Sequence, residues 1–129
     1  HNNSVWQGWS QLPQTGENLI ITKSLKDVMA LYEVAGICAV SLQCENVLPK
    51  QQIFEELSNR FLDIYIFYDN DYDKEENWGQ LFAQKFKESF KVFEILIDDS
   101  YKCKDFSDFV KKYGNIKAKE LINKQLMPF

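Results

Sequence analysis

The stretch Asp63-Ile64-Tyr65-Ile66-Phe67-Tyr68-Asp69-Asn70-Asp71-Tyr72-Asp73 decides the fold of this chain. Its first half is β-branched and aromatic, which is typical of a buried strand. Its second half carries three carboxylates at alternate positions, and like charges held so close need either a cation or full solvation. Oxygen ligands suit Mg²⁺ or Mn²⁺, and the carboxyl end of a strand is where open α/β sheets bind ligands. The stretch therefore predicts a divalent-metal site, with a solvated acidic turn as the structural alternative.

The rest of the chain alternates between strand and helix patterns. Strands are expected at residues 18–24, 37–42, 63–68 and 92–97. Helices are expected at residues 25–35, 49–60, 77–90, 105–113 and 116–126. Connections of this length imply parallel pairing with helices on both faces. The predicted fold class is α/β, a three-layer domain with a central, mostly parallel four-stranded sheet.

The length of 129 residues suits one domain with a real core. Residues 1–16 are interpreted as a lead-in from a preceding domain, and residues 17–129 as the catalytic domain. The first residue is His1 rather than Met, which suggests a fragment of a longer protein.

Composition narrows the function classes. A net charge of −4 argues against a stand-alone nucleic-acid binder, which is usually basic, but not against a metal-dependent catalytic domain. The only histidine is His1, so Ser-His-Asp and Cys-His catalysis are excluded. An odd count of three cysteines, no secretory signal and no membrane-length apolar run predict a cytoplasmic protein without membrane contact.

Three familiar motifs do not fit. An EF-hand loop starting at Asp69 requires Gly at its sixth position and Glu at its twelfth, where this chain has Lys74 and Gln80. The glycine-rich sequences of dinucleotide-binding folds and P-loops are absent after the first strand.

Three polar segments follow strands and are expected at the same edge of a parallel sheet. They are Thr22-Lys23-Ser24-Leu25-Lys26-Asp27, Asp69-x-Asp71-x-Asp73 and Lys104-Asp105-Phe106-Ser107-Asp108. In this order they resemble the Toprim domain of bacterial-type DNA primases, phage primase-helicases, topoisomerases and some nucleases. The resemblance covers roughly residues 17–114, and the Lys-Asp-x-x-Asp segment is similar to the primase branch.

One position departs from the Toprim pattern. The family has Glu just after its first strand, and the corresponding residue here is Lys23. A protonated lysine can neither ligate a metal nor act as a base. Either the domain is catalytically weakened, or Glu45, which follows the second predicted strand, takes over. In the second case Lys23 contacts a nucleotide phosphate or the template backbone.

The resemblance implies roles for the remaining candidates. Asp69 and Asp71 are expected metal ligands with Asp73 more peripheral, for a pair of Mg²⁺ or Mn²⁺ ions. Catalytic roles fall to Glu45, Asp27 and Lys23. Nucleotide or template contacts fall to Lys26, Lys102, Lys104, Asp105 and Asp108. For Asp105 and Asp108, capping of the following helix is the alternative, and for the three lysines it is an ordinary surface position.

Two further groups of residues are given structural interpretations. The aromatic stripe of the third predicted helix is expected to be core: Leu81, Phe82, Phe86 and Phe90. The dispersed lysines from Lys85 onward, including Lys111, Lys112, Lys117, Lys119 and Lys124, are expected on solvated helix faces.

The function implied by the resemblance is that of a DNA primase, a nucleotidyltransferase that makes RNA primers for DNA replication. Its implied partners are a single-stranded DNA template, nucleoside triphosphates and a replicative helicase, in a phage or mobile element. Two alternatives stay open. One is a metal-dependent nuclease or topoisomerase-type domain, and the other is a non-catalytic module that binds nucleic acid or a partner.

Overall fold

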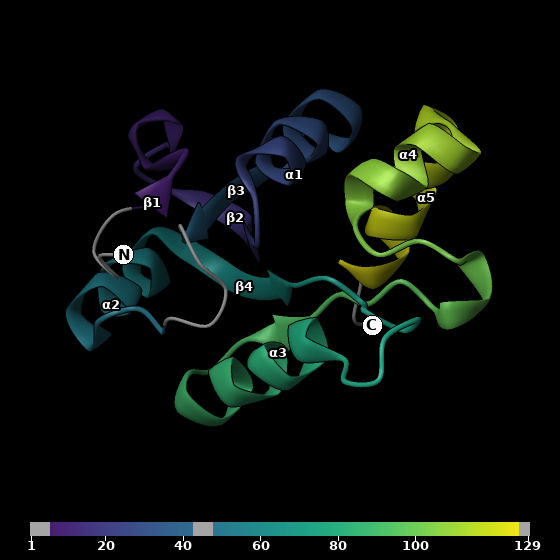
Figure 1. Cartoon of the computed structure of the whole chain (residues 1–129). Coiled ribbons are helices and arrows are strands. Elements are labelled where there is room, and N and C mark those ends of the chain that lie inside the picture. The colour runs from purple at the N-terminus through teal and green to yellow at the C-terminus, as the bar shows by residue number, and fades with distance from the viewer. Residues whose placement is uncertain (1–5, 43–47, 127–129) are drawn as a thin grey trace.

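Five strands and five α-helices build the chain in the computed structural model, which describes residues 6–42 and 48–126 (Figure 1). The strands are β1 (Trp6–Gln7), β2 (Gly16–Thr22), β3 (Cys38–Leu42), β4 (Phe61–Phe67) and β5 (Phe93–Glu94). The helices are α1 (Leu25–Ala30), α2 (Gln51–Arg60), α3 (Trp78–Ser89), α4 (Phe106–Tyr113) and α5 (Asn115–Gln125). Shorter helical turns are η1 (Trp9–Gln11), η2 (Leu31–Ala35) and η3 (Asp99–Tyr101).

The sheet has the order β1-β3-β2-β4-β5, with β2 at its centre. Strands β3, β2, β4 and β5 are parallel neighbours, which confirms the predicted α/β class and the four parallel strands. The short strand β1 was not predicted: Trp6 and Gln7 pair antiparallel with β3, at Leu42 and Ser41. Part of the expected lead-in thus belongs to the sheet, while the division into a preceding domain and a catalytic domain stays a prediction.

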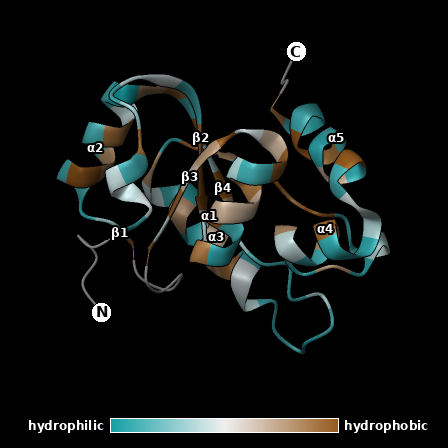
Figure 2. Ribbon diagram, turned by 90° about the horizontal axis from the view of Figure 1, so that it is seen from above, coloured by the Kyte–Doolittle hydropathy of each residue, from teal (hydrophilic) through white to brown (hydrophobic). Residues whose placement is uncertain are grey.

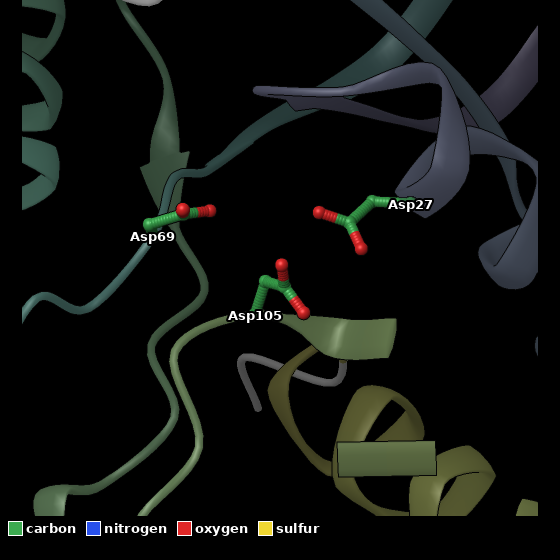
Figure 3. Close-up of side chains that lie close together, drawn as sticks. All are labelled: Asp27, Asp69 and Asp105. Carbon is green, nitrogen blue, oxygen red and sulfur yellow. The ribbon is translucent and has the colours of Figure 1, made fainter. Parts of the chain in front are cut away.

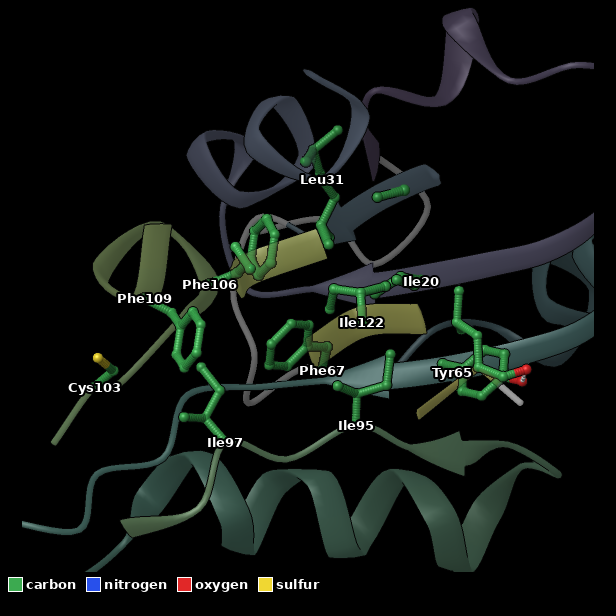
Figure 4. Packing of buried hydrophobic residues seen from close by; sticks show 14 residues of the cluster. Ile20, Leu31, Tyr65, Phe67, Ile95, Ile97, Cys103, Phe106, Phe109 and Ile122 are labelled. Carbon is green, nitrogen blue, oxygen red and sulfur yellow. Dashed lines mark hydrogen bonds between the residues drawn. The ribbon is translucent and has the colours of Figure 1, made fainter. Parts of the chain in front are cut away.

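Helices cover both faces of the sheet, and β4 shows why. Along β4 the side chains alternate between two cores. Ile64, Ile66 and Tyr68 pack with residues of α2 and α3, whereas Tyr65 and Phe67 pack with residues of α1, α4 and α5. Figure 4 shows the second core, where Phe67, Ile95 and Phe106 lie together. In Figure 2 the helices carry both hydrophobic and hydrophilic segments, as surface helices do.

The loop after β2 and the helix that follows it begin and end as the sequence predicts. Ser24 caps α1, its Oγ accepting a hydrogen bond from the Asp27 backbone N–H at 3.3 Å. The last turn, η2, is wound more widely as a π-helix and ends at Gly36, whose φ of 67° suits a residue without a side chain.

Two expectations need correction. The strand predicted at residues 92–97 is reduced to Phe93–Glu94, because the backbone of Leu96 bonds to a side chain of α5 instead of a strand. The Leu96 N–H donates to Gln125 Oε1 at 2.9 Å, and Gln125 Nε2 donates to the Leu96 carbonyl at 3.0 Å. Phe86 of α3 and Phe90, its C-cap, are buried as predicted, but Leu81 is 44 % exposed. The small Gly79 and Ala83 occupy the buried face near the helix start instead.

Within the described ranges, the helices are too short or too polar for any of them to span a lipid bilayer.

Candidate metal centre

Three carboxylates from distant parts of the chain meet at the carboxyl edge of the sheet. They belong to Asp27, Asp69 and Asp105, and one oxygen of each lies within 4.8 Å of the others. Figure 3 shows the three side chains facing a common space from three different segments. Asp27 and Asp69 are buried, and Asp105 is half-buried. A cluster of oxygen ligands this close suits a hard divalent cation.

Parallel pairing explains the meeting of the first two residues. Thr22 at the end of β2 lies in register with Phe67 at the end of β4. The chain then turns into α1 after β2, so that Asp27 lies in the first turn of that helix, while Asp69 follows two residues after the end of β4.

The start of α4 brings Asp105 to the cluster. This residue is the N-cap of that helix, and its Oδ1 accepts a hydrogen bond from the Asp108 backbone N–H at 2.8 Å. The segment before it is tied to the end of β4, because the Asn70 N–H donates to the Lys104 carbonyl at 2.7 Å. The capping interpretation of Asp105 is therefore confirmed, and the same residue also joins the acidic cluster.

The electrostatics of the cluster favour protonation or a bound cation. Burial raises the pKa of Asp69 from 3.8 to about 6, despite the opposing effect of the Lys23 ammonium. The Asp105 and Asp27 carboxylates push this pKa in the same direction as burial. Lys23 Nζ lies 3.2 Å from Asp69 Oδ2, so a lysine ammonium partly neutralises this carboxylate.

The surroundings of Asp27 also disfavour its ionised form. Burial and, after it, the Asp105 carboxylate raise its pKa, while hydrogen bonds from Ser107 lower it. The Ser107 Oγ and backbone N–H donate to the same Asp27 oxygen, Oδ1, at 2.6 and 3.1 Å. The residue is thus held in one orientation by the first turn of α4, a positioning role for Ser107 that sequence reasoning missed.

The other predicted metal ligands are held elsewhere. Asp71 is buried, but its Oδ2 accepts a hydrogen bond from the Gly79 N–H at 3.1 Å, at the start of α3. Asp73 is half-exposed and pairs with Lys104, with 3.4 Å between Oδ1 and Nζ. The structure brings neither of them into the three-carboxylate cluster, and their role as metal ligands stays a prediction.

A network of amides fixes the loop after β4. Asn70 is buried, and its Nδ2 donates to the Ile97 carbonyl at 2.9 Å and to Asp99 Oδ1 at 2.7 Å. Its Oδ1 accepts from Asn77 Nδ2 at 2.7 Å, and Asn77 Oδ1 accepts from the Asp71 N–H at 2.8 Å. In the sequence, the sign of this network is Asn77, which stands in the N-cap position of the predicted third helix.

Gly79 allows α3 to press against the same loop. A Cβ on this residue would lie 2.0 Å from the Asp69 carbonyl oxygen, a distance that no side chain tolerates. Gln80 adds a hydrogen bond from its Nε2 to that carbonyl at 3.1 Å. Contacts between the start of α3 and the Asp69 carbonyl therefore fix the position of this residue.

The other predicted site residues have contacts of their own. Lys26 Nζ lies 3.8 Å from Asp105 Oδ2, and Asp108 Oδ2 accepts a hydrogen bond from the Lys104 N–H at 3.3 Å. Lys102 Nζ lies 5.6 Å from the centre of the Tyr72 ring. Glu45, the predicted substitute for the missing Glu, lies outside the described residues.

Comparisons with known proteins give a match at the level of structure. No family model matches the chain, and no curated protein matches it. The primase fragment of the bacteriophage T7 primase-helicase protein aligns with a TM-score of 0.64 and 14 % identity, over 98 % of this chain and 50 % of that one.

A second match is a chain from a bacteriophage T7 structure in which the lagging-strand DNA polymerase interacts with primase domains of two gp4 subunits, bound to an RNA/DNA hybrid and dTTP. It aligns with a TM-score of 0.66 and 14 % identity, over 98 % of this chain and 61 % of that one. The chain thus spans about half to three fifths of the proteins it matches. It has the Toprim-like α/β fold of a phage primase fragment.

Proposed function

We propose that this chain is the Toprim-like catalytic part of a DNA primase, which joins ribonucleotides on a single-stranded DNA template with the help of Mg²⁺ or Mn²⁺. The observation that carries the proposal is the convergence of Asp27, Asp69 and Asp105 at the carboxyl edge of a sheet with the fold of a phage primase fragment.

The residues present fit a divalent cation. The three side chains offer only oxygen ligands, and burial raises the pKa of Asp27 and of Asp69, so Lys23 and Ser107 compensate their ionised forms only in part. Asp27, Asp69 and Asp105 would hold the ion. A bound divalent ion at such a site lowers the pKa of an attacking hydroxyl and neutralises charge on the transferred phosphate.

The protein's own residues would orient the reactants. Ser107 fixes the Asp27 carboxylate by two hydrogen bonds, and the Asn70–Asn77 network fixes the loop that carries Asp69. Lys26 Nζ lies 3.8 Å from Asp105 Oδ2, and Lys104, which directly precedes Asp105 in the chain, has its Nζ 3.4 Å from Asp73 Oδ1. Their ammonium groups are suited to exchange these carboxylate partners for the phosphates of a nucleotide or template.

The proposal keeps two predicted elements of the site. Glu45 would serve as the acid that replaces the family's Glu, and Asp71 and Asp73 would hold a second ion. The partners are a single-stranded DNA template, nucleoside triphosphates and a replicative helicase.

A second candidate is a non-catalytic Toprim-like module, and one observation favours it. Lys23 Nζ lies 3.2 Å from Asp69 Oδ2, so a protein cation already sits beside a proposed metal ligand. In this alternative the ammonium replaces the metal, and the acidic edge is a remnant of a catalytic site.

The deciding experiment combines metal binding with primer synthesis. The chain is titrated with Mn²⁺ by calorimetry and incubated with ribonucleoside triphosphates and a single-stranded DNA template. We expect binding and labelled short RNA products from the wild type, and neither from Asp69→Asn or Asp105→Asn. Glu88→Gln, an exposed acid on α3, is the matched control.

Each alternative gives its own outcome. Cleavage of labelled DNA with metal, without nucleotide incorporation, would favour a nuclease or topoisomerase-type function. Absence of Mn²⁺ binding by the wild type would favour the non-catalytic module and overturn the proposal.

A further inference from the structure

Positive charge is concentrated in one short part of an acidic chain. Residues 101–119 contain six lysines and two aspartates, whereas the rest of the chain contains nine basic and seventeen acidic residues. The two aspartates, Asp105 and Asp108, lie at the start of α4 and belong to the edge of the metal centre. The other end of α4 and the first turn of α5 therefore carry cations and no acid, and the next acid along the chain is Glu120.

The fold gathers two of these lysines around two tyrosines. The Tyr113 hydroxyl and Lys112 Nζ both donate to the Tyr101 carbonyl, at 3.1 and 3.0 Å, and the two tyrosine rings lie 5.5 Å apart. Lys112 Nζ and Lys117 Nζ lie 5.5 and 6.0 Å from the centre of the Tyr113 ring. We call Tyr101, Lys112, Tyr113 and Lys117 the tyrosine–lysine patch.

The corner between α4 and α5 makes this arrangement possible. Gly114 has a φ of 91°, which permits the chain to leave α4 and enter α5 within one residue. Figure 1 shows α4 and α5 side by side, and residues of both helices share one hydrophobic core. Lys117 in the first turn of α5 is therefore brought to Tyr113 at the end of α4.

The charge of the patch is exposed and uncompensated. Lys112 and Lys117 are exposed, Tyr101 is 38 % exposed, and neither lysine forms an ion pair with any residue in the part of the chain that the structure describes. These two ammonium groups are therefore available to an anion.

Helix stability does not account for the whole patch. Lysines in the last turn of α4 interact favourably with the negative end of the helix dipole, which explains Lys112. Lys117 lies in the first turn of α5, where the dipole disfavours a cation, and this first turn has no acidic residue. A cation placed against the dipole and beside a tyrosine ring calls for another explanation.

We propose that the tyrosine–lysine patch binds single-stranded nucleic acid, independently of metal. Exposed lysines contact backbone phosphates, and tyrosine rings offer bases a surface to stack on, the combination used by single-strand binders. The patch lies about 12 Å along α4 from Asp105, at 1.5 Å of rise per residue over eight residues. A nucleic-acid strand bound at the patch would extend toward the metal centre. This part of the inference rests on the proposed function.

The test is oligonucleotide binding in the presence of a metal chelator. A fluorescent oligothymidylate is titrated with the chain at several salt concentrations. The double variant Lys112→Glu/Lys117→Glu should bind at least about tenfold more weakly, and the slope of log affinity against log salt should fall by about 1.4, as for two lost phosphate contacts on a single strand. Tyr101→Leu should weaken binding without changing that slope.

The matched control is Lys85→Glu/Lys91→Glu. It makes the same change in net charge at exposed positions in and just after α3, which packs on the opposite face of the sheet. We expect the affinity of this control for the oligonucleotide to stay within about twofold of the wild type, because these two lysines lie outside the patch and contact no bound nucleic acid. Equal losses in both double variants, or no loss in the patch variant, would overturn the inference, as would tighter binding of duplex than of single-stranded DNA. Thermal unfolding of each variant confirms that it is folded.

Failure of this inference is separable from failure of the proposed function. Chelator-resistant binding through the patch without primer synthesis would support the patch and count against the primase proposal. Primer synthesis with wild-type binding by the patch variant would do the reverse.

Discussion

Replacing Asp69 by asparagine tests the electrostatic basis of the metal centre. The Asp69 side chain is 11 % exposed, and its surroundings raise its pKa from 3.8 to about 6. A shift of about two units corresponds to about 3 kcal/mol at 1.36 kcal/mol per unit, an upper limit on the cost of ionising this group in the folded state.

The sign of the pH dependence follows from that shift. Because the pKa of folded Asp69 lies above its ordinary value, the folded state binds more protons than the unfolded state between about pH 4 and about pH 6. The contribution of Asp69 to stability is fully present below about pH 4 and is lost as pH rises through about 6. Asparagine does not ionise, so the variant lacks this loss.

The expected result has two parts. Without metal at about pH 7, Asp69→Asn should raise the free energy of unfolding by about 1–2 kcal/mol, less than the upper limit because the site is partly open to solvent and water screens part of the cost of the charge. With Mn²⁺ at about 100 times its Kd, the wild type should gain about 2.7 kcal/mol and the variant almost nothing.

Urea unfolding followed by fluorescence, with and without Mn²⁺ and across this pH range, measures both quantities. Asp98→Asn is the control, because it is an acid outside the cluster whose pKa is lowered by hydrogen bonds from Ser100. Destabilisation of the metal-free Asp69→Asn variant at neutral pH, or equal stabilisation of both proteins by Mn²⁺, would refute the reasoning.

Three further changes probe the same edge of the sheet. Lys23→Met removes the cation 3.2 Å from Asp69 and should tighten Mn²⁺ binding by up to about fivefold in calorimetry, since a partly exposed ion pair contributes at most about 1 kcal/mol. Ser107→Ala removes the 2.6 Å hydrogen bond to Asp27 and should weaken Mn²⁺ binding by about tenfold, the effect of losing a group that orients a ligand. Gly79→Ala places a Cβ against the Asp69 carbonyl and should lower the free energy of unfolding by about 1–3 kcal/mol, although alanine is the better helix former.

Each of these changes has a clear contrary result. Weaker Mn²⁺ binding by the Lys23→Met variant would show that the ammonium supports the site rather than competing with the ion. Unchanged binding in Ser107→Ala would remove the positioning role of that hydroxyl. A Gly79→Ala variant as stable as Gln84→Ala, an exposed α3 position, would show that the loop moves freely away from the helix.

The fold was largely predictable from local patterns. The apolar run ending at Tyr68 predicted a strand buried on both faces, and β4 indeed serves two cores. Ser24 and Asp105 predicted helix starts, and both cap their helices in the structure. These features depend on side-chain period and on hydrogen bonds within a few residues, which a sequence shows directly.

Strand β1 and the shortened β5 were not predictable in the same way. Trp6 and Gln7 become a strand only because β3 offers an unpaired edge. The C-terminal part of the expected fourth strand meets a glutamine of α5 instead of another strand. Both outcomes depend on partners far away in the sequence.

The membership of the acidic cluster was decided by the tertiary structure. The alternation of Asp69, Asp71 and Asp73 suggests three ligands on one side, but the period of two holds only while the chain is a strand, and β4 ends at Phe67. Beyond that point contacts set each direction: the start of α3 draws Asp71 to the Gly79 N–H, and the docking of α4 brings Asp105 to Asp69 and Asp27. The sequence by itself thus determined which edge of the sheet is acidic. Only the packing of α1, α3 and α4 determined which carboxylates meet there.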